Sequence, residues 1–103
     1  MPGGTVPTGN FLIDTQLSSE RIASGQSVMV IITYTTDNSG KSIQITHDPG
    51  FSVTPLKVSA PPGVGMVVRA QLTVHRKGST YGSVLLTFNL AMSYQAEVLR
   101  VLP

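Results

Sequence analysis

The chain has 103 residues, of which 41% are hydrophobic and 12% are charged, a balance that favours one folded domain over a disordered chain. Seven Lys and Arg against five Asp and Glu leave a net charge of +2, too small an excess to indicate binding to nucleic acid or to an anionic membrane surface. The absence of cysteine excludes disulfides, zinc–thiolate sites and thiol nucleophiles, and no segment has the roughly 20 apolar residues of a membrane-spanning helix.

The N-terminal segment and the first strand come next in chain order. Residues 1–10 are rich in Pro, Gly and Thr, and we expect them to form a flexible arm or linker. Residues 11–103 are then predicted to form a single domain. A first strand is expected over residues 11–17, with Phe11, Ile13, Thr15 and Leu17 on one face. The polar stretch 18–26 follows, with Ile22 as its apolar anchor.

Residues 27–36, SVMVIITYTT, form the longest run of β-branched and apolar residues and are expected to be the central strand. One face of this strand carries Val28, Val30, Ile32 and Tyr34. The other face is apolar only at its start, which indicates a strand with neighbours on both sides that is covered on both faces near one end. Turn-forming residues flank it, SGQ before and DNSG after.

Further strands are predicted over residues 41–47, 51–53, 56–58, 64–75, 81–91 and 94–102. Pro55 confines the segment 51–58 to a protected sheet edge, because proline cannot donate a ladder hydrogen bond. In the long strand 64–75 we expect an inner face of Val68, Ala70, Leu72 and Val74. In the last strand, apolar residues change faces between Val98 and Leu99, which predicts a bulge. About seven strands without helical periodicity favour an all-β, antiparallel two-sheet sandwich, with a partly closed barrel as the alternative.

A family resemblance is carried by the runs ASGQSVMVIITYTT and GFSVTPLKVSAPPGVGMVVRAQLTVHRKGSTYGSVLLTFNL. Together with a closing strand, they resemble immunoglobulin-like modules of bacterial multidomain proteins, with turn residues at Ser24–Gln26, Pro62-Gly63 and Gly82. The resemblance covers nearly all of the chain from Phe11 on and implies an immunoglobulin-like sandwich. The cysteine pair and core tryptophan of antibody domains are missing. Tyr81, near the start of the penultimate strand, is the candidate for a tyrosine corner.

Residues for catalysis or metal binding are sparse. The histidines, His47 and His75, are in no triad-like arrangement, although Asp48 follows His47 directly. The carboxylates are scattered at Asp14, Glu20, Asp37, Asp48 and Glu97. We therefore expect no enzyme, no catalytic residue and no cofactor. A calcium site that uses Asp37 and Asp48 stays open, because the DNSG segment offers oxygen ligands, but that segment is first of all a hairpin turn.

Ligand binding through aromatic side chains is the other possibility. Sugar-binding sandwiches stack aromatic rings on pyranoses, and the candidates here are Tyr34, Tyr81 and Tyr94, at least two of which we expect to pack in or near the core. Three tyrosines on one exposed face would favour glycan binding. The local basic group of Arg69, His75, Arg76 and Lys77 lacks interleaved aromatics, so no nucleic-acid binding is expected.

The leading functional hypothesis is a non-catalytic immunoglobulin-like module, acting as a spacer or as an adhesion or protein-interaction unit in a larger secreted or surface protein. Its partners would be neighbouring domains or another protein, met through loops or along an edge strand. Two alternatives remain: a carbohydrate-binding module attached to an enzyme, and a subunit of a virion or filament assembly. No membrane insertion is expected in any of these.

Overall fold

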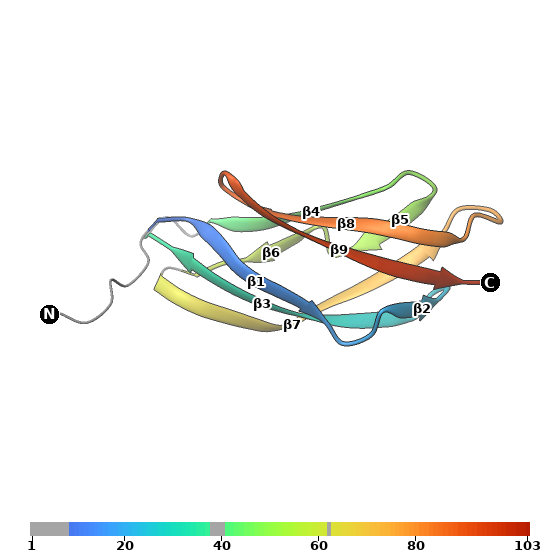
Figure 1. Cartoon of the computed structure of the whole chain (residues 1–103), viewed down its shortest axis with the longest axis horizontal. Helices are drawn as coiled ribbons and strands as arrows, with labels where there is room; N and C mark the ends of the chain where they lie inside the picture. Colours follow the sequence, from blue (N-terminus) through green and yellow to red (C-terminus); the bar gives the residue numbers. More distant parts are fainter. Residues whose placement is uncertain (1–8, 38–40, 62) are drawn as a thin grey trace, which may run out of the picture.

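The computed structural model describes residues 9–37, 41–61 and 63–103, which form nine strands and no helix (Figure 1). The strands are β1 (Phe11–Leu17), β2 (Arg21–Ala23), β3 (Ser27–Thr36), β4 (Ser42–His47), β5 (Phe51–Thr54), β6 (Lys57–Ser59), β7 (Gly63–Arg76), β8 (Gly82–Leu90) and β9 (Ser93–Leu102). They build a four-stranded sheet in the order β1-β3-β7-β5 and a five-stranded sheet in the order β2-β9-β8-β4-β6. None of the described residues forms a helix long and apolar enough to cross a membrane.

The two sheets confirm the predicted all-β sandwich, but with nine strands instead of about seven. Each of the eight predicted ranges corresponds to an observed strand, and the ninth strand, β2, is three residues around Ile22 that lie among polar neighbours and were not predicted. Ile22 is the expected anchor, with 2% of its surface exposed. The ladder between β2 and β9 is parallel, so the sandwich is not wholly antiparallel.

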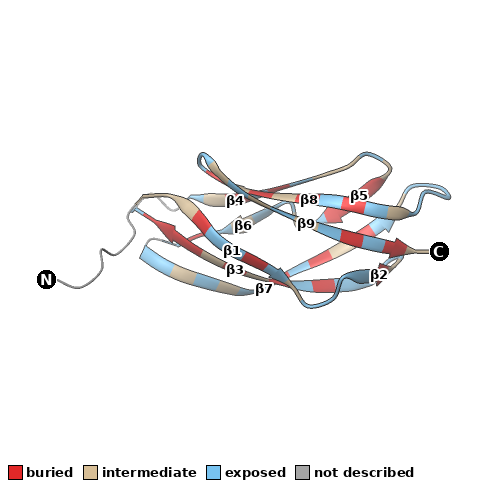
Figure 2. Ribbon diagram, in the orientation of Figure 1, coloured by how far each residue is buried: buried red, intermediate tan, exposed pale blue. Residues whose placement is uncertain are grey.

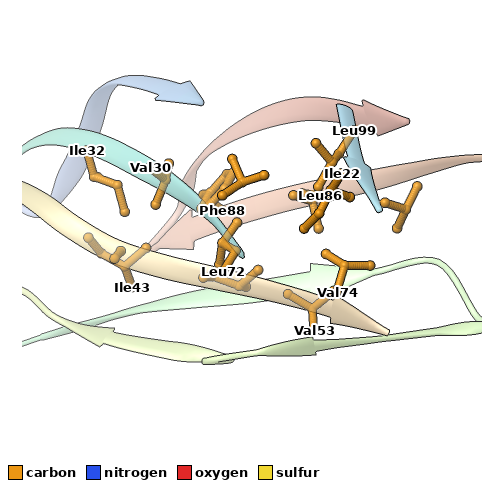
Figure 3. Packing of buried hydrophobic residues seen from close by; sticks show 14 of the residues in the cluster. Ile22, Val30, Ile32, Ile43, Val53, Leu72, Val74, Leu86, Phe88 and Leu99 are labelled. Carbon is orange, nitrogen blue, oxygen red and sulfur yellow. The ribbon is translucent and has the colours of Figure 1, made fainter. Parts of the chain in front are cut away.

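The core lies between the sheets, where alternate residues of the facing strands point inward (Figures 2 and 3). Figure 3 shows aliphatic side chains from both sheets meeting around Phe88, which is fully buried. The largest fully buried side chains are Phe88, Ile22, Ile32, Ile43, Leu72, Leu86, Leu90, Leu99, Val30, Val53, Val74 and Val84. Burial of this much aliphatic surface is the main stabilising term of the fold.

Strand β3 is central, as predicted, with β1 and β7 on its two sides. Its even-numbered residues from Val28 to Tyr34 face the core. The apolar pattern predicted that β3 is covered on both faces near its start, but it is covered on both faces near its end. Met29, near the start, is 42% exposed, whereas Thr35 and Thr36 at the end are buried. Phe11 and Val64 are the cross-strand neighbours of Thr35 on the outer face.

A bulge in β1 corrects the predicted face of that strand. Leu12 lies opposite Tyr34 and Asp14 lies opposite Thr33, so Ile13 is one residue more than β3 can pair. Leu12 and Thr15 are therefore buried with Leu17 packed against the core, while Ile13 is 43% exposed. The prediction that Phe11, Ile13, Thr15 and Leu17 share one face was wrong, because Phe11 and Ile13 lie on the outer face.

A second bulge, in β7, corrects the predicted inner face of the long strand. Val30 pairs with Ala70 and Ile32 pairs with Val67, so β7 has one extra residue between these pairs. Val67 takes the inward position and Val68 is 48% exposed, contrary to the prediction. Beyond the bulge, Ala70, Leu72 and Val74 are buried as expected.

The last strand contains no bulge, because the ladder between β8 and β9 runs in unbroken register. Leu99 and Val101 face the core, and Ala96 and Val98 face solvent. The predicted bulge was wrong: Val98 is an apolar residue on the outer surface of a regular strand.

The segment that contains Pro55 lies at a sheet edge, as predicted. β5 is the edge of the four-stranded sheet, and β6 is the edge of the five-stranded sheet. The chain changes sheets between them, at the cis Thr54–Pro55 peptide bond. Strand β1 begins and strand β9 ends at opposite ends of the sandwich (Figure 1).

Candidate interaction surface

The three candidate tyrosines are not brought together. Tyr34 is 4% exposed and points into the sandwich, whereas Tyr81 and Tyr94 are 54% and 67% exposed. One tyrosine, not two, packs in the core. Tyr81 precedes the start of β8, and Tyr94 pairs with Asn89 near its end, so about eight residues, or ~26 Å of strand, separate them. The condition set for glycan binding, three tyrosines on one exposed face, is not met.

Tyr81 contacts Arg76, whose guanidinium carbon lies 5.5 Å from the ring centroid. This cation–π contact ties the end of β7 to the start of β8 at the surface. In a tyrosine corner, the tyrosine hydroxyl bonds to the backbone a few residues upstream. The exposure of Tyr81 does not fit that role.

The histidines do not meet a carboxylate within the described residues. Nδ1 of His47 lies 2.9 Å from the carbonyl oxygen of Asp48, not from its carboxylate. His75 is exposed on β7 opposite Ser52. These positions assemble no nucleophile, base and orienting acid of the kind that hydrolytic sites use.

Asp37 and Asp48, the candidate calcium ligands, each bond to a different part of the chain. The Asp37 carboxylate accepts a hydrogen bond from Asn10 Nδ2 (2.9 Å), and the Asp48 carboxylate accepts one from the Leu85 amide (3.0 Å). They lie beyond opposite ends of β4, ~20 Å apart for a strand of this length. Asn38, Ser39 and Gly40 lie outside the described residues. Among the described residues, no group of three or more His, Asp or Glu side chains could hold a metal ion.

Glu97 lies on β9 in an environment that changes the acidity of its carboxyl group. Burial raises the pKa of its carboxyl above the ordinary value of 4.5, and the negative charges of Asp14 and Glu20 raise it further. The three carboxylates meet where β1 of one sheet lies along β9 of the other. Like charges at this rim cost stability instead of forming a site.

We expect Glu97→Gln to stabilise the fold at pH 7. A raised pKa means that the folded state disfavours the carboxylate, so its penalty is absent below the ordinary pKa and appears as pH rises through the raised value. The gain should be at most about 1 kcal/mol, because solvent screens a charge at the rim. Urea unfolding at pH 7 and at pH 3 measures it. Equal stability of both proteins at pH 7, or a gain that persists at pH 3, would contradict this assignment.

The outer surface of the four-stranded sheet carries exposed apolar side chains that take no part in the core. From the start of β1 to just beyond its end, this surface carries a set of apolar side chains that we call the apolar face. Three of them occupy alternating positions on β7, namely Val64, Met66 and Val68, with exposures of 61%, 57% and 48%. The full set is Phe11, Ile13, Met29, Ile31, Val64, Met66 and Val68.

The remaining end of the same surface is polar, which gives the apolar face a boundary. Ser27 and Thr73 hydrogen-bond through their hydroxyls (3.1 Å), and His75 lies beyond them opposite Ser52. The two bulges enlarge the apolar face, since they turn Ile13 and Val68 outward. Contiguous exposed apolar surface of this kind usually marks an interaction site.

Strand β7 adds an open edge beside the apolar face. β5 pairs only with residues 73–76 of β7, so within the described chain residues 63–71 have a strand neighbour, β3, on one side only. The N–H of Met29 donates to Oγ of Ser18 (3.0 Å) and its C=O accepts from the Ser18 amide (2.8 Å), so both groups of Met29 point toward β1 and away from β7. The N–H and C=O groups of successive residues in a strand point alternately to its two sides. Counting from Met29, the main-chain groups of Tyr34 therefore point toward β7, and those of its partner Gly65 point toward β3. The N–H and C=O groups of Val64 and Met66 then point to the open side.

Comparison with known proteins bears on the fold. Scans against models of protein families and against curated proteins found no match. Among solved structures, the chain is similar to domains 4 and 5 of the S-layer protein SbsC, with a TM-score of 0.50 and 16% sequence identity. The match covers 92% of this chain and 54% of that one, so the chain spans about half of the matched structure. At this level of identity the likeness concerns the fold alone.

Proposed function

We propose that this chain is a non-catalytic immunoglobulin-like module of a secreted or cell-surface protein, where it spaces neighbouring domains and contacts other chains. The observation that carries the proposal is the likeness of nearly the whole chain to domains of an S-layer protein, a protein of the cell surface. Nδ1 of His47 lies beside a backbone carbonyl oxygen and not a carboxylate, and no group of three described His, Asp or Glu side chains could hold a metal ion, which agrees with a role that needs no chemistry.

The strand order supports the immunoglobulin-like part of the proposal. The sequence β1-β3-β7-β5 corresponds to the A-B-E-D sheet of a constant-type immunoglobulin domain, and β9-β8-β4 corresponds to its G-F-C sheet. β2 and β6 extend the second sheet at its two edges. The entry of the chain at one end and its exit at the other suit a module placed in series with others (Figure 1).

A carbohydrate-binding role has less support, because its three tyrosines occupy the core and two separate surface sites. An interaction role has more, because the apolar face and the open edge of β7 give a partner both side-chain and main-chain contacts. The partner surface would then be a sheet, not the loops.

Surface exposure on cells that naturally produce the chain is the expected result that tests this proposal. Antibodies raised against residues 9–103 should label intact cells as strongly as permeabilised ones. A cytoplasmic protein labelled in parallel is the control for membrane integrity. Labelling that requires permeabilisation would contradict a secreted or surface location.

A further inference from the structure

We infer that the open edge of β7, residues 63–68, pairs antiparallel with the same edge of a second copy of this chain. The two four-stranded sheets would become one continuous sheet across a two-fold axis. The inference goes beyond the proposed function and does not depend on where the protein is located. It begins from a contrast between this edge and the other edges of the sandwich.

The other edges carry features that oppose pairing with another chain. Asp14 lies in the bulge of the β1 edge, and Gln16 is exposed further along it. β2 has only three residues, with the charged Arg21 first. The segment of β5 and β6 is broken at Pro55, and β6 begins with the charged residue Lys57. Short length, bulges, charges and proline are the usual means of protecting an edge.

The β7 edge has none of these protections from Gly63 to Val68. The segment, GVGMVV, contains no charged residue and no proline, and its main-chain groups at Val64 and Met66 point away from β3. An extended apolar edge with unpaired N–H and C=O groups is a template for strand addition. The bulge ends this segment, because it breaks the ladder before Ala70.

A two-fold axis at Met66 makes the segment complementary to itself. Met66 would lie opposite Met66 of the second copy, and Val64 opposite its Val68, with the outward side chains of both copies on one surface. A homodimer of this kind uses one patch twice, as two-fold interfaces do. Cross-strand pairs of apolar side chains stabilise a ladder beyond its hydrogen bonds.

The placement of charge favours this register and a second copy as the occupant. Arg69, the first charged residue after the segment, would lie opposite Gly63 of the other copy, away from Arg69 of that copy. An axis at Val68 would instead bring the two Arg69 side chains onto neighbouring positions, where like charges destabilise a ladder. With the axis at Met66, no charged residue of either copy faces another.

Self-association of the full chain tests the inference, with two matched methionines as probe and control. Met66 and Met29 are both exposed, at 57% and 42%, on the outer face of the same sheet, but Met29 lies on the central strand. Sedimentation equilibrium from about 1 µM to about 1 mM should show a monomer that becomes a dimer, over the range in which small interfaces dissociate. Met66→Lys should weaken the dimer at least about tenfold and Met29→Lys less than about threefold, because edge lysine opposes strand pairing.

Cysteine cross-linking gives a second readout that does not require Met66→Lys to fold. The chain has no native cysteine, so each introduced thiol is unique. Directly opposed residues of a hydrogen-bonded antiparallel pair have Cα atoms about 5.5 Å apart, within the range for a disulfide. Met66→Cys should therefore form a disulfide-linked dimer on mild oxidation, and Met29→Cys should remain largely without a disulfide cross-link.

Each other outcome overturns the inference. A chain that stays monomeric throughout the concentration range, with no Met66→Cys dimer, has no such contact. A dimer that Met29→Lys and Met66→Lys weaken equally packs through the apolar face and not through the edge. Dimer formation by Met29→Cys alone would place the contact elsewhere on the sheet. None of these results would alter the cell-labelling test, so failure here and failure of the surface proposal are distinguishable.

Discussion

Replacing Phe88 by alanine should lower the free energy of unfolding by about 3–5 kcal/mol, the range for a fully buried phenylalanine. Phe88 is wholly inaccessible on the inner face of β8, opposite Ile45 of β4. Small domains are stable by about 5–15 kcal/mol, so the variant should lose a large part of its stability. The shift of the urea midpoint at unchanged slope measures the loss.

Phe11→Ala is the matched control for this prediction. Phe11 is half-buried on the outer face of the four-stranded sheet, where truncation leaves an exposed dent instead of an internal cavity. Its loss should be less than half of that for Phe88→Ala. Comparable losses for the two variants would mean that the core does not lie between the sheets as described.

Gly65→Ala should destabilise the protein by about 1–3 kcal/mol, the usual cost of overpacking. A Cβ atom on Gly65 would lie 2.5 Å from Oη and 2.7 Å from Cζ of Tyr34, which is almost fully buried. The ring would have to move within a filled core. Chemical denaturation of the variant measures the cost.

Repeating Gly65→Ala in a Tyr34→Leu background tests whether the loss of stability comes from the contact with the tyrosine ring. Without the tyrosine ring, the added methyl group meets no close atom of that side chain, so Gly65→Ala should cost less than half as much in this background. A double-mutant cycle isolates this coupling. Equal costs in both backgrounds would show that the effect of Gly65 arises from the backbone and not from Tyr34.

Most of the strands could be predicted from the alternation of apolar and polar residues, because a strand with one buried face has an apolar residue at every second position. The ranges 11–17 and 27–36 agree with the observed β1 and β3. β2 could not be found in this way, since three residues around Ile22 are too few for a period. Its pairing with β9 depends on contacts from far along the chain.

The bulges explain why the faces of β1 and β7 were predicted wrongly. A bulge places two residues of one strand opposite one residue of its partner, so its position depends on the pairing of the two strands and not on one strand alone. The signals that could have indicated it are the apolar doublets Leu12-Ile13 and Val67-Val68, in which adjacent residues cannot both face the core of a regular strand. The exposure of Ile13 and Val68 follows directly from this geometry.

The open edge of β7 could not be predicted, because it depends on where a different strand ends. Pro55 indicated a break in the segment 51–58, but nothing in that segment says that β6 joins the other sheet. Once β5 stops at Thr54, the first half of β7 is left with one neighbour. The candidate surface therefore arises from topology, and the residue types along β7 become informative only afterwards.

Amide hydrogen exchange along β7 in dilute, monomeric protein is the most direct test of the central claim that this edge is open. The amides of Gly65 and Leu72 point toward β3 and should exchange slowly, whereas those of Val64 and Met66 should exchange rapidly. Raising the protein concentration should slow Val64 and Met66 alone. Slow exchange of all four amides in the monomer would show that another part of the chain already covers the edge, and would contradict the account.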